Sequence, residues 1–414
     1  MNNNKNNNKF NWKILIVITF AGFASGIYRN GIMTLFPFLQ SDFNLSRAQV
    51  GLYSSFLFIS MALSVIFAGR IADYFGVKKS IFWGLLLLGL FVILHSFANN
   101  FALLMLFATL SGLGLSIILP STSKAVSEWF KGDNQATAMG IMTTGLAMGG
   151  VFGASFLPWL TEKIGWQMTI TFLGILFFIT SFLFYYFYKD NNKNLYKIDN
   201  KKDTDNTLLQ NLRLFLTNKY LLMLCIIGII FGVVSGIIVT HFSFFLYTDH
   251  NYSKITAGMG LMVLQIGSMF GRTGWSYLNN KFLGGVERKG FVLIGILSSI
   301  VILIFSFLNY FNPSLIFILF LAFMLGATGR GWHGLYFSEV SKQVGEENAG
   351  MGVGLALFFI RFGIIIGPPI FGLIADETNT YSYSWLSLSI IVFIVIIISN
   401  YFLNKYEDER INTI

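Results

Sequence analysis

The chain has 414 residues, of which 55% are hydrophobic and only 11% are charged, against about 25% charged residues in a typical soluble domain. This composition excludes an ordinary soluble protein and indicates that most of the chain is surrounded by lipid. The formal net charge of +9 does not indicate nucleic-acid binding, because the basic residues lie in short connections between apolar runs, and the single cysteine, Cys225, excludes a disulfide framework.

Twelve apolar runs are long enough to cross a bilayer, which takes about 20 residues. In chain order they cover 14–38, 49–69, 80–98, 101–124, 137–160, 166–188, 219–246, 254–278, 290–308, 314–340, 349–375 and 383–403. The first run is too long for a removable signal peptide and lacks a small-residue cleavage site. We therefore predict an all-α integral membrane protein.

The polar stretch 189–218, rich in Asn, Lys and Asp, divides the runs six and six. It predicts a solvated linker, with a short amphipathic helix near LLQNLRLFL. The predicted domains are an N-terminal tail at 1–13, a six-helix bundle at 14–188, the linker at 189–218, a second bundle at 219–403 and a C-terminal tail at 404–414.

Lysine and arginine are concentrated in alternate connections. The two tails and the connections after the even-numbered runs hold nearly all of them, whereas the other connections hold only Arg47, Lys163 and Lys254. Positive residues mark the cytoplasmic side of a membrane protein. We predict a multi-pass cell-membrane protein with both termini in the cytoplasm.

Two segments of the chain repeat each other. SEWFKGDNQATAMG begins at Ser127 and SEVSKQVGEENAGMG at Ser338, and each has Ser-Glu, a lysine three residues after the glutamate, and Met-Gly at the start of the next run. Small residues that allow close helix packing follow both, at Gly145, Gly149 and Gly153 and at Gly363 and Gly367. We predict two homologous halves, as in many transporters, with Glu128 and Glu339 as gate or helix-end partners.

The connection after the second run reads GRIADYFGVKK, residues 69–79. Gly69 and Gly76 would let helix ends approach closely, Asp73 could face the positive N-terminal end of a neighbouring helix, and Lys78 and Lys79 would hold the loop at the anionic cytoplasmic leaflet. This spacing predicts a latch. The alternative is that the lysines only set the topology.

These residues resemble the signature loop of the major facilitator superfamily, although Tyr74 stands where that loop usually has a basic residue. Together with the twelve runs and the linker, the resemblance covers the whole chain. It implies two pseudo-symmetric six-helix bundles and a monomeric secondary transporter that works by alternating access.

Two further segments resemble the anion:cation symporter branch of that superfamily. They are YRNGIMTLFPFLQSDFNLSRAQVG, where the branch has a substrate-binding arginine in its first span, and SKAVSEWFKGDNQATAMG. The second is also similar to organophosphate antiporters, but those use an arginine in the seventh span, where this chain has only His241. Oxalate-type antiporters use basic residues in spans eight and eleven, which is compatible with Arg272 and Arg361.

Five basic residues fall inside the apolar runs: Arg29, Lys124, Arg272, Arg330 and Arg361. A charge at the bilayer centre costs on the order of 3 kcal/mol even on the most lenient scale. No Asp or Glu lies near mid-depth in any run, so the expected counter-ion is the substrate, a small organic anion held by guanidinium groups.

The depth of each basic residue separates binding from structural roles. Arg29, Arg330 and Arg361 lie near mid-depth and are the main candidates, with bonding to carbonyls of broken helices as the alternative. Arg272 is a further candidate, although at about a turn and a half from its predicted span end it could snorkel. His333, one turn from Arg330, could couple a proton or make a helix contact.

The sequence carries no nucleotide-binding GK[ST] loop, HExxH, CxxC or nucleophile elbow. We therefore predict no enzyme activity, cofactor or metal, and no ATP-driven pumping. The predicted function is secondary transport of a small organic anion, such as a carboxylate or sugar acid, coupled to a proton or a counter-anion by symport or antiport. The alternatives are a transporter of neutral or cationic compounds and a transporter-like ligand sensor.

Overall fold

The computed structural model describes residues 11–190, 217–311, 313–345 and 349–411, and the regular elements in these ranges are all helices. The first half contains α1 (Trp12–Gly31), η1 (Ile32–Leu35), α2 (Phe36–Phe43), α3 (Arg47–Phe75), α4 (Val77–His95), α5 (Phe101–Trp129), α6 (Asp133–Ile164) and α7 (Trp166–Phe187). The second half contains α9 (Lys219–Thr248), α10 (Lys254–Phe282), α11 (Glu287–Phe307), η3 (Leu308–Tyr310), α12 (Leu315–Gly329), α13 (His333–Val344), α14 (Ala349–Glu377) and α15 (Ser382–Ile411).

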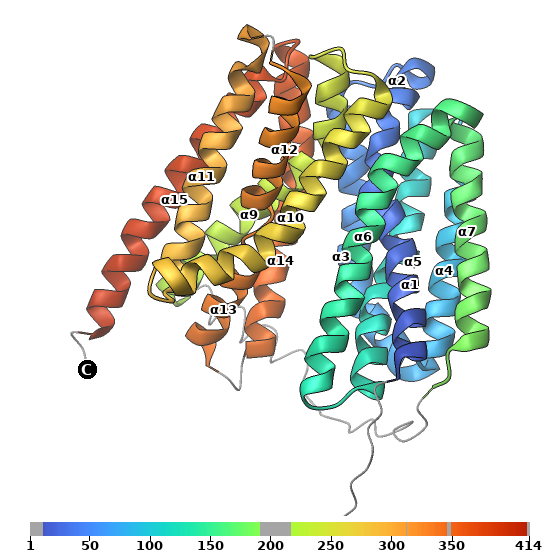
Figure 1. The fold of residues 1–414 in the computed structure, drawn as a ribbon, viewed down its shortest axis with the longest axis horizontal. Helices are drawn as coiled ribbons and strands as arrows, with labels where there is room; N and C mark the ends of the chain where they lie inside the picture. The colour runs from blue at the N-terminus through green and yellow to red at the C-terminus, as the bar shows by residue number, and fades with distance from the viewer. Residues whose placement is uncertain (1–10, 191–216, 312, 346–348, 412–414) are drawn as a thin grey trace, which may run out of the picture.

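The two halves form two helix bundles that lie side by side (Figure 1). We call them the N-bundle (Trp12–Phe187) and the C-bundle (Lys219–Ile411). Their main contacts with each other are made by α3 with α14 and by α6 with α10. The predicted fold class, an all-α membrane protein of two bundles, is confirmed.

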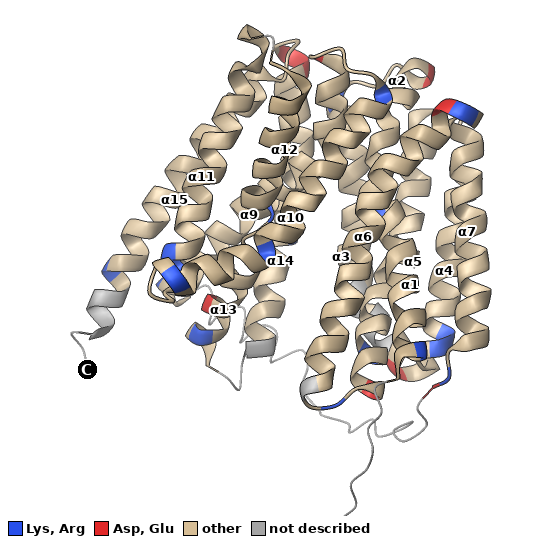
Figure 2. Ribbon diagram, viewed as in Figure 1, with Lys and Arg blue, Asp and Glu red and all other residues tan. Residues whose placement is uncertain are grey.

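The two ends of the molecule differ. At one end, which we call the termini face, α1 begins and α15 ends; at the other end, the opposite face, α3 begins and α14 ends (Figure 1). Lysine and arginine are most frequent towards the termini face, and a few lie about halfway along the helices (Figure 2).

In the described part of the chain, ten helical segments are long and apolar enough to cross a membrane, judged by length and composition. α3 and α10 are not among the ten, although each has 29 residues. Several helices extend past the predicted runs, because the polar ends of a helix carry no apolar signal: α10 continues to Phe282. The amphipathic helix predicted near LLQNLRLFL lies outside the described residues.

The outer helices of each bundle present apolar side chains to the surroundings. Trp83 on α4, Phe182 on α7, Ile300 on α11 and Phe393 on α15 are all exposed. Large exposed hydrophobic side chains on a soluble protein would be a liability, whereas here they form the surface that meets lipid. The uncharged runs of these four helices agree with that position.

Glycines set the closest helix contacts in both bundles. A Cβ atom on Gly149 of α6 would overlap the carbonyl oxygen of Phe23 in α1, and one on Gly363 of α14 would overlap that of Ile229 in α9. The other predicted packing glycines make the same kind of close contact: Gly145 and Gly153 pack against α1, and Gly367 packs against α9. The two bundles therefore repeat one packing arrangement, as the sequence repeat predicts.

Candidate functional site

The membrane segment that carries Arg330 is broken at its middle. α12 ends at Gly329 and α13 begins at His333, so Arg330, Gly331 and Trp332 lie outside regular helix. The apolar run 314–340 continues through this break, so the sequence pattern does not reveal it. Gly331 is required there, since a Cβ atom would collide with the carbonyl oxygen of Ala327 and with backbone of Gly271 in α10.

A break in a membrane helix frees carbonyl groups that need new donors. The indole Nε1 of Trp275, on α10, donates to the carbonyl of Ala327 at 2.8 Å. The carbonyl of Gly329 accepts from the Trp332 indole at 3.0 Å and from the Ser235 hydroxyl at 3.2 Å. Side chains from α9 and α10 thus hold the break in one conformation.

His333 helps to cap the same break. Its Nδ1 lies 3.0 Å from the carbonyl oxygen of Arg330, and its ring stacks on Trp332 with centroids 3.9 Å apart. Trp332 in turn stacks on Phe231 of α9 at 4.7 Å. These are contacts of the kind that the helix-contact interpretation of His333 predicts.

The predicted arginines lie close enough for four pairs of their charges to interact. The charge of Arg29 interacts with those of Arg361 and Arg272, and the charge of Arg330 interacts with those of Arg272 and Arg29. We call Arg29, Arg272, Arg330 and Arg361 the arginine cluster. Arg29 comes from α1 in the N-bundle, whereas the other three come from α10, the α12–α13 break and α14 in the C-bundle.

Within the described residues, no carboxylate pairs with any member of the arginine cluster. The Nε atoms of Arg272 and Arg330 are buried without a hydrogen-bond partner there, and Arg29 lies 6.0 Å from the ring centroid of Phe58. α10 extends ten residues beyond Arg272, or about 15 Å at 1.5 Å per residue, so Arg272 lies further from its helix end than the predicted run indicates. The four arginines are partly buried, and partly buried positive charges without a carboxylate partner favour an external anion.

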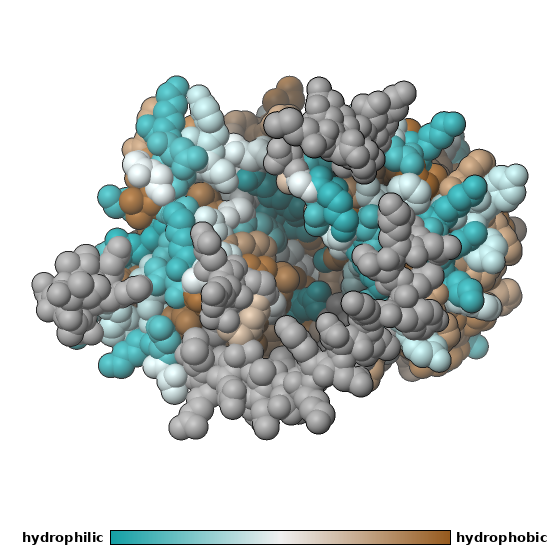
Figure 3. Space-filling view, turned by 90° about the horizontal axis from the view of Figure 1, so that it is seen from below, coloured by the Kyte–Doolittle hydropathy of each residue, from teal (hydrophilic) through white to brown (hydrophobic). Residues whose placement is uncertain are grey.

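The molecule is hollowed between the two bundles on the termini face. Figure 3 looks at this face and shows a depression between the bundles with hydrophilic residues in its depth. Among the described residues, the hydrogen bonds that join the N-bundle to the C-bundle lie from mid-depth to the opposite face, such as Gln265 to the carbonyl of Gly150 at 3.0 Å and Thr240 to Ser54 at 2.8 Å.

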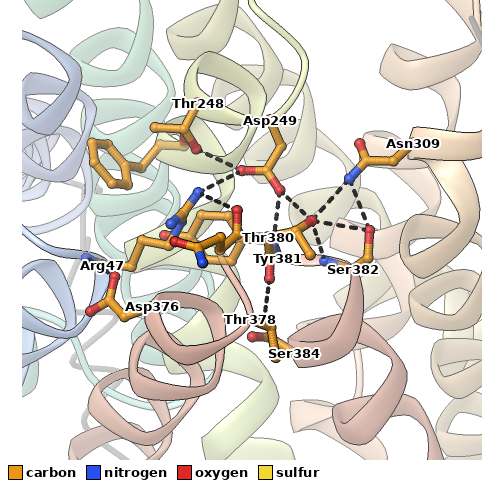
Figure 4. A network of polar contacts seen from close by, with 12 residues as sticks. Arg47, Thr248, Asp249, Asn309, Asp376, Thr378, Thr380, Tyr381, Ser382 and Ser384 are labelled. Atoms are coloured by element: carbon orange, nitrogen blue, oxygen red, sulfur yellow. Dashed lines mark hydrogen bonds and ion pairs between the residues drawn. The ribbon is translucent and has the colours of Figure 1, made fainter.

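The opposite face is closed by a polar network around Arg47 and Asp249 (Figure 4). Arg47 Nη2 donates to Asp249 Oδ1 at 3.3 Å, and the guanidinium carbon lies 5.2 Å from the ring centroid of Tyr381. Asp249 also accepts the backbone N–H of Tyr381 at 2.7 Å. Burial lowers the pKa of the neighbouring His250, so this imidazole is neutral at pH 7 and adds no charge to the network.

Asp376 of α14 closes the same face by capping a helix in the other bundle. Its carboxylate accepts the backbone N–H groups of Arg47 at 2.8 Å and Ala48 at 2.9 Å, the first two residues of α3. Free N–H groups and the positive end of the dipole make a helix N-terminus a good site for a carboxylate. Sequence reasoning notes Arg47 only as a loop charge, and no local signal reveals that Asp249 and Asp376 meet it.

On the termini face, the predicted latch residues make contacts within the N-bundle. Asp73 pairs with Lys124 at 2.6 Å and not with a helix N-terminus. The carboxylate of Asp190 takes that place, accepting the backbone N–H of Lys78 at 3.0 Å at the start of α4. Gly76 joins α3 to α4 with φ of 79°, which favours glycine.

The remaining predicted latch and gate residues are spread over both bundles. Lys78 Nζ lies 4.2 Å from the ring centroid of Tyr185, Lys79 is exposed, and the surroundings of Gly69 are outside the described residues. The charge of Glu128 interacts with Lys124 and Asp190. Glu339 accepts the Tyr220 hydroxyl at 2.6 Å inside the C-bundle, so it is a helix-end partner in this state.

Comparison with known proteins places the chain in a family. The sequence pattern of the Major Facilitator Superfamily matches residues 18–359. The chain is 24% identical to the hexuronate transporter of Bacillus subtilis over 90% of each chain, and 22% identical to the probable galactarate/D-glucarate transporter GudP of Escherichia coli over 87% of this chain and 86% of that one. It is also 24% identical to the quinolone resistance protein NorA of Staphylococcus aureus, over 93% of this chain and 96% of that one.

Solved structures show the same fold. A bacterial homologue of the human lysosomal transporter Spinster, in an inward-facing and unoccupied conformation, superposes with a TM-score of 0.76 at 16% identity, covering 95% of this chain and 97% of that one. The predicted resemblance is therefore confirmed, and the chain is a transporter and not an enzyme. It belongs to the Major Facilitator Superfamily.

Proposed function

We propose that this protein carries a small organic anion across the cell membrane by alternating access, with the arginine cluster as its binding site. The observation that supports this proposal is a group of four guanidinium groups, in which Arg29 interacts with each of the other three charges, and which have no carboxylate partner among the described residues. Guanidinium groups bind carboxylates in a bidentate geometry. A bound anion would neutralise these partly buried charges.

The relatives support sugar acids as the first compounds to test. Two of them are named as transporters of hexuronates and of galactarate and D-glucarate. NorA is named for quinolone resistance, which supports the alternative of a drug transporter. A site with four positive charges would repel a cationic drug, so we favour the anion.

The transport cycle would use the two ends of the molecule in turn. The described state is hollowed at the termini face and closed at the opposite face, so with the termini in the cytoplasm it would be inward-open. We propose that α3 and α10 also span the membrane, that the bundles correspond to the predicted domains 14–188 and 219–403, and that the transporter is a monomer. Coupling to a proton or to a counter-anion are both compatible with the site.

A ligand panel on the purified full chain tests the proposal. Glucuronate, galacturonate, glucarate and 4-hydroxybenzoate would be compared with glucose and with the cation ethidium, using thermal stabilisation and uptake into proteoliposomes. We expect one or more acids to stabilise the protein and to be taken up, and Arg29→Gln to abolish uptake. Lys289→Gln, an exposed change at the start of α11, is the control that should have no effect. Uptake of ethidium without any acid would contradict the proposal.

A further inference from the structure

The number and distribution of charges in the arginine cluster carry more information than their sign. The cluster holds four positive charges, and the acids nearest to it along the chain lie towards helix ends, such as Asp376 and Glu339, where each already has hydrogen-bond donors. A single carboxylate can accept a bidentate contact from one guanidinium group. A substrate with one carboxylate would therefore leave most of the cluster uncompensated.

The four arginines are also divided between the two bundles. Arg29 is the member from the N-bundle, and its charge interacts with Arg272 and Arg361 of the C-bundle. Like charges that interact across two bundles oppose a closer approach of those bundles. A ligand with negative charge at both ends would convert this repulsion into attraction on both sides.

The nitrogen atoms without hydrogen-bond partners support the same conclusion. The buried Nε atoms of Arg272 and Arg330 both lack a hydrogen-bond partner in the described part of the chain, and they come from different elements of the C-bundle. Side chains from other helices already satisfy the carbonyl groups freed at the α12–α13 break, through Trp275, Trp332 and Ser235. The guanidinium groups are thus not needed to cap that break and remain available to a ligand.

From this arrangement we infer that the site is built for a dianion with two separate carboxylate groups, one held by Arg29 of the N-bundle and the other by the arginines of the C-bundle. This inference rests on the proposed function and narrows it from organic anions in general to dicarboxylates. The ligand would connect the two bundles, because one of its carboxylates would contact the N-bundle and the other the C-bundle. Binding would then favour closure of the hollow on the termini face.

Three six-carbon compounds of the same stereochemistry test the inference on the purified full chain. Glucitol has no carboxylate, gluconate has one and glucarate has two, so the series changes charge while keeping the hydroxyl-bearing chain. Titration calorimetry at fixed ionic strength and pH 7, where both acids are fully ionised, would give each Kd. We expect glucarate to bind at least tenfold more tightly than gluconate, and glucitol to show no binding.

Variants show whether Arg29 recognises the second carboxylate. Arg29→Gln should bring the ratio of the two Kd values close to one while gluconate binding is retained, and Lys289→Gln should leave the ratio at its original value. If Arg29→Gln does not fold, the ratio in the unmodified protein still decides the matter.

Each result has a distinct meaning. Gluconate binding as tightly as glucarate would overturn the dicarboxylate inference and leave the proposed anion transport standing. Binding of neither acid, nor of glucuronate or 4-hydroxybenzoate, would overturn the proposed function and this inference with it.

Discussion

Arg330 lies at the break in its membrane segment, directly after the last residue of α12. The sequence identifies it as a candidate because a charge in an apolar run is costly. What the sequence does not reveal is the support around it, since Trp275 and Ser235 come from helices far away in the chain. Charge and depth are local properties, whereas the conformation of the break depends on tertiary contacts.

Two substitutions of Arg330 distinguish the contribution of its charge from that of its planar guanidinium group. Arg330→Gln should reduce kcat/KM for the transported anion at least tenfold, equivalent to about 1.4 kcal/mol, because a charged donor is lost from a partly buried site. Arg330→Lys should restore only part of the rate, since an ammonium group lacks the planar fork. Initial uptake rates in proteoliposomes measure both, with Lys289→Gln as the matched control. Wild-type rates in Arg330→Gln would exclude the residue from the site.

At the scale of the elements, the helices were easier to predict than the way they end and break. Apolar runs located the spans because lipid demands continuous apolar surface. The polar ends of α10 and the break after Gly329 were missed, because neither changes the apolar pattern enough to be noticed. The packing glycines, in contrast, could be predicted, since their spacing of four residues places them on one face of α6.

These glycines allow a matched pair of substitutions on a single helix. In Gly363→Ala the new methyl group would meet the carbonyl oxygen of Ile229, whereas Gly354 of α14 has open space around its Cα. We expect Gly363→Ala to lower the thermal midpoint and the folded yield, because α14 must move away from α9. Gly354→Ala should be neutral or stabilising by up to about 1 kcal/mol, from helix propensity alone. Equal midpoints in the two variants, measured in detergent, would show that α9 and α14 do not need this close approach.

For the whole molecule, the state with the hollow at the termini face depends on contacts at the other end. Asp376 caps α3 across the boundary between the bundles, and Arg47 joins α3 to the loop after α9. Arg47 and Asp376 are 329 positions apart in the sequence. No periodicity or motif predicts such a pair, so from the sequence alone Arg47 is only a charge in a loop.

Removing the cap should shift the balance between the two states. Asp376→Ala leaves two N–H groups of α3 without their carboxylate, a loss of about 1 kcal/mol for a helix cap, which would raise the population open at the opposite face roughly fivefold. Spin labels at Lys163→Cys and Tyr310→Cys, on exposed ends of the two bundles, in a Cys225→Ser background, should then report longer distances. Asp42→Ala is the control, because Asp42 bonds Trp166 within the N-bundle. An unchanged distance distribution would mean that Asp376 does not hold this face closed.

Counterflow in proteoliposomes tests the central claim, transport of an organic anion through the arginine cluster, most directly. Vesicles loaded with unlabelled glucarate would be diluted into labelled glucarate, and the same measurement made with glucuronate. We expect transient accumulation of label above equilibrium in the unmodified protein and in Lys289→Gln, none in Arg29→Gln, and accumulation at least tenfold slower in Arg330→Gln. Accumulation that persists in both arginine variants, or its absence for every acid while a cationic dye is transported, would contradict the account.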